Sequence, residues 1–374
     1  MLPEPNFPVR PDELVGRRPE IELFRQTLEQ GLSAGRTGSF AILGDWGMGK
    51  SSLLLKFAAL CADPAYSMLP VVVSGSKDIH DYHRLAEILL DKFAELLLTT
   101  ANTRSRVWAQ LGDGTLSRVT PGAGLAREAR PYFLSSGSSL LRHQLREAWE
   151  HILQPAKIKG AVFFIDDLQN ITAIHKADLA LMLRDQFQAF GIEGMNYSVC
   201  FTAKGDFFGE IRDFAEPAAR FYTKLYLAPF TREETSEYID SVLRGASNDD
   251  VLAARLYEKT LGHPYFLAVL CRQLAMDAGG LQQLDFEQAW PAIFEQLSRE
   301  KFRSDVSQLS AKEFELLRRA AQLKQEEVAV HELDHEFQRE YFGRLAGRGL
   351  LIRVARGRYK LYHPLFRTFL QDAK

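Results

Sequence analysis

A glycine-rich stretch that ends in a lysine and a serine carries the clearest chemistry in this sequence. Its spacing is G-x-x-x-x-G-K-S, and it lies between an apolar run that predicts a strand and a leucine-rich run that predicts a helix. This order predicts a phosphate loop, in which backbone N–H groups and a helix N-terminus hold an anion. Lys50 would reach the β- and γ-phosphates, and the Ser51 hydroxyl would be a ligand to Mg²⁺. The predicted nucleotide-binding residues here are Gly44, Asp45, Trp46, Gly47, Met48, Gly49, Lys50, Ser51 and Ser52.

Two aspartates follow a second buried apolar run, at residues 161–165. Asp166 and Asp167 would stand at the carboxyl end of a central strand, where ligands bind in open α/β sheets. Asp166 would hold Mg²⁺ through a water molecule, and Asp167 would orient or deprotonate the attacking water. A polar strand end that caps the next helix would explain one aspartate, but it explains a pair less well. With the phosphate loop, the pair predicts an ATPase that uses Mg²⁺.

Short apolar runs alternate with helical patterns from residue 14 to residue 230. The predicted strands are residues 40–43, 69–74, 161–165, 197–202 and 224–227. Strands that alternate with helices predict a three-layer α/β domain, of the P-loop NTPase type, with a mainly parallel sheet. Residues 1–13 contain four prolines and predict an extended N-terminal arm. Residues 100–137 predict an inserted surface loop, for which contact with DNA or a partner is the alternative interpretation.

The pattern changes at residue 231, where a capping box begins a series of helices. Residues 231–300 predict a small α-helical lid domain, and no strand pattern is expected before about residue 350. Residues 301–374 predict helices followed by a two-stranded β-hairpin, which is the order of a winged-helix domain. The sequence thus predicts an arm, an ATPase domain at 14–230, a lid and a winged helix.

Composition restricts the class of protein. The 374 residues are 46% apolar and 25% charged, which is typical of soluble globular domains. A net charge of −2 gives no general attraction to nucleic acid. Cys61, Cys200 and Cys271 have the spacing of neither a disulfide framework nor a zinc site. No stretch reaches the length of a membrane span, so we expect a cytoplasmic protein without a membrane partner.

The order of these motifs resembles the STAND-type signalling ATPases and the closely similar archaeal-type AAA+ ATPases, which are related to the Orc/Cdc6-like group. Leu14 to Glu20 is similar to their hhGRExE box, although Arg18 replaces the usual glutamate. The resemblance implies that Val15, Gly16 and Arg17 lie against the adenine and ribose. It extends from about residue 14 to residue 370 and implies ATP or ADP as the bound nucleotide.

Three further positions follow from the resemblance. Thr202-Ala203-Lys204 looks like the sensor motif T-S/T-R, so Lys204 would detect the γ-phosphate, as a point charge rather than a bidentate fork. Arg220 lies where relatives carry an arginine finger, and a surface salt bridge is the equal alternative. Pro264 matches the G-x-P motif of the lid. His363 lies where the family's histidine contacts the β-phosphate of ADP, and a histidine that closes a surface strand is the equal alternative.

Two functions from different classes agree with these residues. The first is a slowly hydrolysing ATPase switch, whose ADP or ATP state controls the lid, the winged helix and assembly into a homo-oligomer. The second is a DNA-binding ATPase, similar to replication initiators or transposition regulators, that uses its wing. A scaffold that only binds nucleotide is a third interpretation, which the intact Lys50, Ser51, Asp166 and Asp167 disfavour. The wing residues in question are Arg353, Arg356, Arg358 and Lys360.

Other features bear on the partners of the protein. The helix before the wing would face outward with Glu336, Arg339, Glu340 and Gly343, and its two acids would repel phosphates. These acids therefore disfavour reading of DNA bases, and they leave contact of the wing with the DNA backbone as an open alternative. Relatives carry repeats or effector domains after the winged helix, whereas this sequence ends at Lys374, so we expect any sensor or effector to be a separate partner or the DNA itself.

Overall fold

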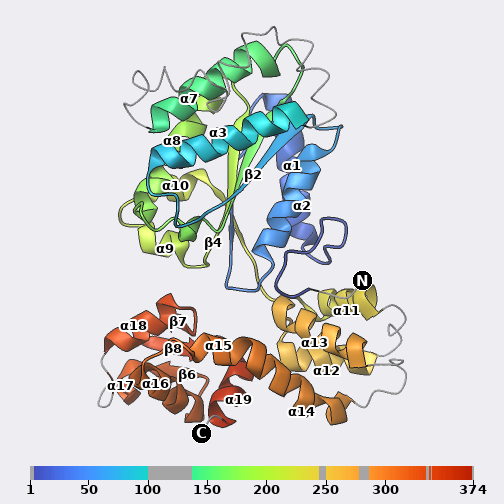
Figure 1. Cartoon of the computed structure of the whole chain (residues 1–374), viewed down its shortest axis with the longest axis vertical. Helices are drawn as coiled ribbons and strands as arrows, with labels where there is room; N and C mark the ends of the chain where they lie inside the picture. Colours follow the sequence, from blue (N-terminus) through green and yellow to red (C-terminus); the bar gives the residue numbers. More distant parts are fainter. Residues whose placement is uncertain are drawn as a thin grey trace. The chain divides into compact units, whose positions relative to one another are not determined.

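The computed structural model describes residues 4–99, 137–243, 250–277, 286–333, 337 and 339–372 (Figure 1). The chain divides into two compact units. The first unit is Phe7–Ala228, and the second contains Pro229–Lys374 together with the described residues before Phe7. The predicted insert at 100–137 lies outside the described residues except for Gly137, where helix α7 begins. Residues 4–13 contain no helix or strand, as the four prolines predict.

The first unit is built on a sheet of five parallel strands in the order β2-β3-β4-β1-β5 (Figure 1). The strands are β1 Phe40–Leu43, β2 Met68–Ser74, β3 Gly160–Asp166, β4 Tyr197–Ala203 and β5 Thr223–Tyr226. The helices are α1 Arg18–Ala34, α2 Lys50–Ala62, α3 Tyr82–Thr99, α7 Gly137–Ala148, α8 Lys176–Ile192, α9 Phe207–Ile211 and α10 Glu216–Phe221. A π-helical turn at Trp149–Leu153 extends α7, and a 3₁₀ turn at Leu168–Asn170 follows β3.

Helices cover both faces of this sheet, so its inner strands β1, β3 and β4 are buried almost throughout, whereas the edge strand β5 is partly exposed. Along β3, Phe163 and Ile165 pack with residues of α3, α7 and α8. The intervening Val162 and Phe164 pack on the other face with residues of α1 and α2. Side chains of a strand alternate between its faces, and here both sets are buried. The predicted three-layer α/β domain is confirmed.

The second unit contains helices and a small antiparallel sheet in the order β6-β8-β7. Its lid helices are α11 Arg232–Leu243, α12 Asp250–Thr260, α13 Pro264–Asp277 and α14 Phe286–Leu297, followed by a π-helical turn at Ser298–Phe302. The remaining elements are α15 Arg303–Val306, α16 Ala311–Gln322, β6 Glu327–Ala329, α17 Val330–Leu333, α18 Arg339–Gly347, β7 Leu351–Ala355, β8 Arg358–Leu361 and α19 Pro364–Asp372. Helices followed by a β-hairpin agree with the predicted winged helix.

The structure corrects one expectation for this unit. The sequence predicts no strand between residue 231 and about residue 350, but β6 pairs antiparallel with β8. This strand has three residues, which is too short for an alternating pattern to be recognised. The predicted division into a lid at 231–300 and a winged helix at 301–374 stays a prediction. Tyr265, Phe266 and Val269 of α13 pack in the same apolar cluster as Leu316 and Phe366.

Candidate nucleotide-binding site

β1 and β4 are neighbours in the sheet, and the connections that follow them run toward opposite edges of the sheet. From β1 the chain continues to β2 at one edge, and from β4 it continues to β5 at the other edge. Connections that leave neighbouring strands in opposite directions open a crevice at this position. The phosphate loop follows β1, and Lys204 follows β4. The topology therefore brings both predicted motifs to one crevice.

The phosphate loop has the backbone conformation that its glycines allow. Gly47 and Gly49 have φ angles of 76° and 84°, which favour glycine. Gly49 stands directly before α2, so the loop ends at a helix N-terminus, where backbone N–H groups have no partner within the helix. Trp46 is 51% exposed, whereas Met48 is buried in the core. This conformation agrees with the predicted phosphate loop, and the contact of its residues with phosphate stays a prediction.

Arg17 of the predicted hhGRExE box supports this loop from within the protein. Its side chain is buried, and Nη2 donates to the carbonyl oxygen of Met48 at 3.0 Å. Gly16 and Arg17 both adopt left-handed φ angles, 70° and 59°, immediately before α1. A buried guanidinium that donates to the loop backbone restrains the loop. The predicted contact of Val15, Gly16 and Arg17 with adenine and ribose stays a prediction.

Asp166 accepts two hydroxyl hydrogen bonds on a single carboxylate oxygen. Its Oδ1 atom lies 3.0 Å from Ser51 Oγ and 2.6 Å from Thr202 Oγ1. Carboxylate and hydroxyl oxygens are ligands that Mg²⁺ prefers, so Ser51 and Asp166 fit the predicted metal site. Within the described ranges, no group of three or more His, Cys, Asp or Glu residues is arranged for a metal. Mg²⁺ usually takes most of its ligands from water and substrate phosphates, so a two-residue site is sufficient.

Thr202 also binds the second aspartate, a role that the sequence did not predict. Its Oγ1 accepts the backbone N–H of Asp167 at 2.7 Å while its hydroxyl hydrogen goes to Asp166. Asp167 has a left-handed φ angle of 53°, which is uncommon for a residue with a side chain. Its Oδ1 accepts a hydrogen bond from Nε2 of Gln169 at 2.9 Å. The T-S/T-R resemblance identified the motif, but it directed attention to Lys204 rather than Thr202.

Lys50 lies among these carboxylates. Its Nζ donates to the carbonyl oxygen of Asp45 at 2.8 Å. Burial lowers the pKa of Lys50 below its usual value, and the negative charges of Asp167, Asp45 and Asp166 oppose this shift. The positive charge of Lys204 lowers the pKa further, so Lys204 lies within electrostatic reach of Lys50. A phosphate placed here would relieve the cost of burying this cation.

The structure places Arg220 apart from these residues. Arg220 lies in α10 with its side chain exposed, and it forms an ion pair with Glu216 one helical turn away. This is the surface salt bridge of the alternative interpretation. A role as an arginine finger toward another subunit stays a prediction, and it would require Arg220 to leave Glu216.

Pro264 and His363 belong to the second unit, where each has a structural role. Pro264 is the first residue of α13. His363 is buried, its Nε2 lies 2.9 Å from the carbonyl oxygen of Thr260, and its Nδ1 accepts the backbone N–H of Leu365 at 3.1 Å. Because Nδ1 accepts, Nε2 carries the proton and donates. Burial lowers the pKa of His363 to about 4. His363 thus joins the chain before α19 to the end of α12, and its predicted contact with ADP would require it to release one of these bonds.

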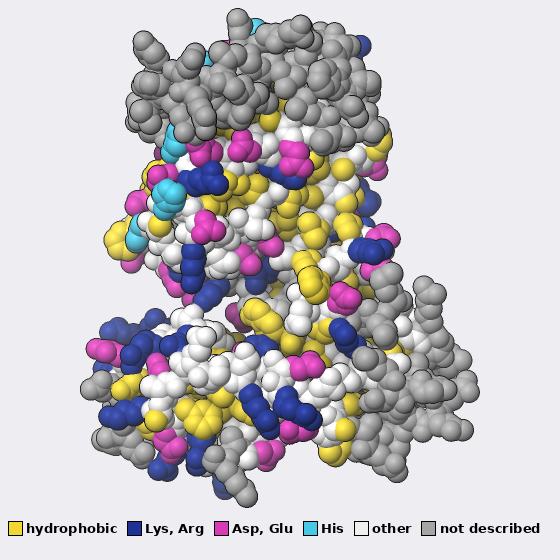
Figure 2. All heavy atoms as spheres, in the orientation of Figure 1, with side chains coloured by type: hydrophobic (Ala, Val, Ile, Leu, Met, Phe, Trp, Pro, Cys, Tyr) yellow, Lys and Arg dark blue, Asp and Glu magenta, His cyan; other side chains and the backbone are white. Residues whose placement is uncertain are grey.

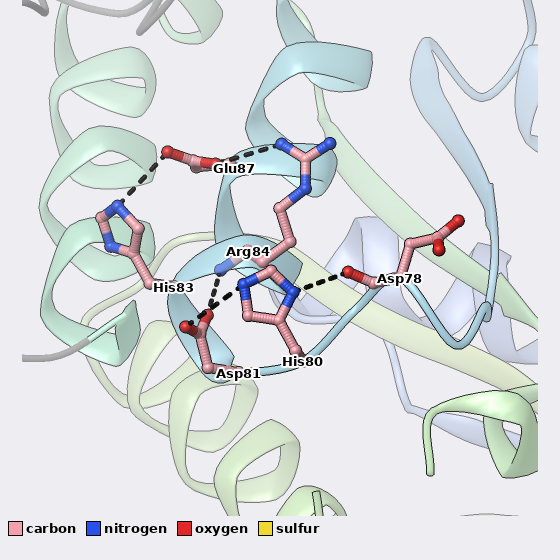
Figure 3. Close-up of polar contacts among 6 residues, drawn as sticks. All are labelled: Asp78, His80, Asp81, His83, Arg84 and Glu87. Carbon is pink, nitrogen blue, oxygen red and sulfur yellow. Dashed lines mark hydrogen bonds and ion pairs between the residues drawn. The ribbon is translucent and has the colours of Figure 1, made fainter. Parts of the chain in front are cut away.

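A cluster of histidines and carboxylates begins α3, after the carboxyl end of β2 (Figure 3). Asp81 Oδ1 accepts the backbone N–H of Arg84 at 2.7 Å and thereby caps the helix. Glu87 lies 3.1 Å from Arg84 and 3.3 Å from His83, and His80 lies 3.8 Å from Asp81. All of these contacts are local, and they stabilise the first turns of α3.

Residues 13–190 match the family described as the AAA ATPase domain. This segment is an AAA ATPase domain. The whole fold is similar to the Walker-type ATPase PABY2304 of Pyrococcus abyssi, at 17% identity and a TM-score of 0.63 over 97% of each chain. It is also similar to the ORC2 protein of Aeropyrum pernix in its ADPNP–ADP complexes, at 14% identity and a TM-score of 0.61 over 98% of this chain and 97% of that one. No curated protein matches the sequence.

Replacing Thr202 by valine tests the link between the two aspartates of the AAA ATPase domain. Thr202→Val removes the donor to Asp166 and leaves the N–H of Asp167 without its acceptor, so we expect a loss of about 1–3 kcal/mol in the free energy of unfolding. Ser198→Ala is the matched control, because Ser198 Oγ is buried in the same strand and has no hydrogen-bond partner among the described residues. Denaturant unfolding of both variants measures the difference. Equal stabilities would contradict the assignment.

The buried His363 should make the stability of the protein depend on pH. Its folded pKa is about 4, whereas an unfolded histidine titrates near 6.5, so protonation favours the unfolded chain. The contribution is complete above pH 6.5 and is lost as the pH falls toward 4, by about 2 kcal/mol at about pH 4.5. Denaturant unfolding at pH 7 and pH 4.5 should show this loss in the wild type but not in His363→Gln. The exposed His331→Gln should retain the wild-type dependence; the same dependence in all three proteins would disprove the prediction.

No helix in the described ranges is both long and apolar enough to cross a bilayer.

Proposed function

We propose that this protein binds and slowly hydrolyses ATP and works as a nucleotide-operated switch. ADP and ATP would favour different arrangements of the unit Pro229–Lys374, because a ligand shifts an equilibrium only if it binds the two states with different affinity. The AAA ATPase domain and the cluster of Lys50, Ser51, Asp166 and Asp167 support nucleotide binding and hydrolysis. The observation that supports switching is the short segment of chain that leads to the lid from Leu227, a residue beside the start of the phosphate loop.

This connection is anchored at both ends. In the first unit, the backbone N–H of Leu227 donates to the carbonyl oxygen of Leu43 at 2.7 Å, and a Cβ built on Gly44 would lie 3.3 Å from Leu227 Cβ. In the second unit, the N–H of Phe230 donates to the carbonyl oxygen of Gly262 at 2.8 Å. Only residues 228 and 229 lie between the two anchors in the sequence. Displacement of the phosphate loop at Gly44 would therefore act almost directly on the lid.

The second unit would move as one body. The lid and the winged helix share an apolar core, and His363 joins them through the carbonyl oxygen of Thr260. Separating the lid from the winged helix would expose this core to water, which is unfavourable. The hinge at residues 228 and 229 is thus the more favourable place for motion.

Hydrolysis would proceed by attack of water on the γ-phosphorus. The bond to the β,γ-bridging oxygen breaks, ADP leaves with that oxygen, and the proton of the water passes through Asp167 to the medium or to the phosphate released. Lys50 would stabilise the charge that develops on the phosphate oxygens. When bound at Ser51 and Asp166, Mg²⁺ would neutralise phosphate charge. The shorter carboxylate of Asp167, compared with a glutamate, and the point charge of Lys204 agree with slow turnover.

Distances between labels on the two units test the switch. The three natural cysteines are buried, so Lys92→Cys, at a partly exposed position, and Lys312→Cys, at an exposed position, can be labelled selectively. We expect different inter-label distances with ADP and with a non-hydrolysable ATP analogue, measured by fluorescence transfer or spin-label spectroscopy. Light scattering on the same samples should show a larger particle with the ATP analogue if the ATP state assembles into a homo-oligomer.

Lys50→Ala is the control for nucleotide dependence. It should abolish ATP binding and turnover. The inter-label distance in this variant should therefore be the same with ADP, with the ATP analogue and without nucleotide. Identical distances with ADP and the ATP analogue in the wild type would disprove the switch. Wild-type turnover in Lys50→Ala would disprove the assignment of the site.

A DNA-binding ATPase is the second candidate, and the wing of the second unit favours it. Arg353, Arg356 and Lys360 are exposed and have no ion-pair partner in the described part of the chain, whereas Arg358 lies 3.5 Å from Glu327. Figure 2 shows several Lys and Arg side chains over the part of the chain that contains α18, β7 and β8. Arg339, Glu340 and Gly343 of α18 are exposed as predicted, and Glu336 lies outside the described residues.

The salt dependence of DNA binding distinguishes this candidate. If Arg353 and Arg356 contact phosphates, the double variant Arg353→Ala/Arg356→Ala should reduce the slope of log affinity against log salt concentration by about 2. Arg299→Ala/Arg303→Ala is the matched control, because both of these arginines pair with Glu295. Fluorescence anisotropy with duplex DNA at several salt concentrations measures the slope. An unchanged slope, or no binding by the wild type at low salt, would exclude the wing as a DNA contact.

A further inference from the structure

Gln169 is a polar residue of the site that neither the motifs nor the proposed roles explain. It lies in the 3₁₀ turn after β3, two residues beyond Asp167. Its Nε2 donates to Asp167 Oδ1 at 2.9 Å, and its Oε1 is buried and has no hydrogen-bond partner among the described residues. A carboxylate oxygen can only accept, so the amide must turn its NH₂ group toward Asp167. The amide thus binds Asp167 while its own carbonyl group stays unsatisfied, at a cost in free energy.

The backbone of Asp167 is restrained independently of Gln169. Thr202 accepts its N–H, and a Cβ built on Gly75 would lie only 2.5 Å from its carbonyl oxygen. Gly75 also donates its N–H to the carbonyl oxygen of Asp166 at 2.7 Å. The carbonyl oxygen of Asp167 also accepts the N–H of Asn170 at 2.9 Å, so hydrogen bonds restrain the peptide groups on both sides of the Asp167 Cα. Rotation of the carboxylate about the side-chain bonds is the freedom that remains, and the hydrogen bond from Gln169 restricts it.

We propose that Gln169 is a positioning residue for ATP hydrolysis, which holds the Asp167 carboxylate so that its second oxygen can accept the proton of the attacking water. This inference rests on the proposed hydrolysis of ATP and on the role of Asp167 in it. Gln169 acts through Asp167 and does not contact the nucleotide in this scheme. Because a misdirected catalytic group slows the chemical step without weakening substrate binding, loss of Gln169 should lower kcat and leave nucleotide affinity unchanged.

Gln169→Leu is the first test, because leucine has similar volume and no hydrogen-bond donor. We expect kcat to fall roughly 10- to 100-fold while the Kd for a fluorescent ATP analogue stays within about twofold of the wild type. Asn170→Ala is the matched control, since Asn170 is the exposed next residue of the same turn. It should retain wild-type kcat. Gln169→Glu provides a second variant of the same size, in which repulsion between carboxylates should reduce kcat further, so poor folding of the leucine variant would not prevent the test.

Combination with Asp167→Asn shows whether Gln169 acts through Asp167. In the Asp167→Asn background, Gln169→Leu should cause little further loss of kcat, because the group that it positions is already absent. Wild-type kcat in both Gln169 variants, a loss of nucleotide affinity that accounts for the effect, or an equal fold loss in the Asp167→Asn background would each overturn the inference. If the wild type shows no turnover that Lys50→Ala removes, the proposed ATPase activity itself fails, and that result is distinct from the others.

Discussion

The site depends on one carboxylate oxygen that joins the ends of three strands. Asp166 Oδ1 accepts the hydroxyl of Ser51, which follows β1, and the hydroxyl of Thr202 from β4. The parallel register that pairs Ile165 with Phe201 makes the second bond possible, because it brings the next residues of β3 and β4 together. Without this oxygen, the two hydroxyls would lose their acceptor, and Ser51 at the start of α2 would lose its hydrogen bond to β3.

The features that the sequence predicted well are local in the chain. The phosphate loop is a contiguous pattern between a strand and a helix, and a run of apolar residues before Asp166 and Asp167 is enough to recognise a buried strand end. The roles of Thr202 and Gln169 were not predicted, since each depends on which side chains meet in space. The register between β3 and β4 determines the contact of Thr202 with Asp166. The left-handed conformation of Asp167 determines its contact with Gln169. Neither leaves a periodic signal in the sequence.

His363 illustrates the same limit at the level of domains. Its place in the order of motifs was visible, but its partner was not, because Thr260 lies 103 residues earlier in the chain. The predicted division of residues 231–374 into a lid and a winged helix followed helix and hairpin patterns, which report local structure. Whether residues on both sides of this predicted division share a buried core depends on how the helices pack in space. The shared core and the buried His363 join the two predicted parts, which the patterns do not reveal.

A switch requires that phosphate binding change the loop that contacts the connection to the lid, and Lys50 provides a means. Its ammonium group is held by the carbonyl oxygen of Asp45, the residue after Gly44, while burial lowers its pKa. A phosphate is a stronger partner for a cation than a neutral carbonyl is, so binding would draw Lys50 from Asp45 and release the first turn of the loop. Gly44 packs on Leu227, from which only residues 228 and 229 lead to the anchor on Gly262. In the proposed switch, the exchange of one hydrogen bond at Lys50 is therefore the event that the hinge would transmit.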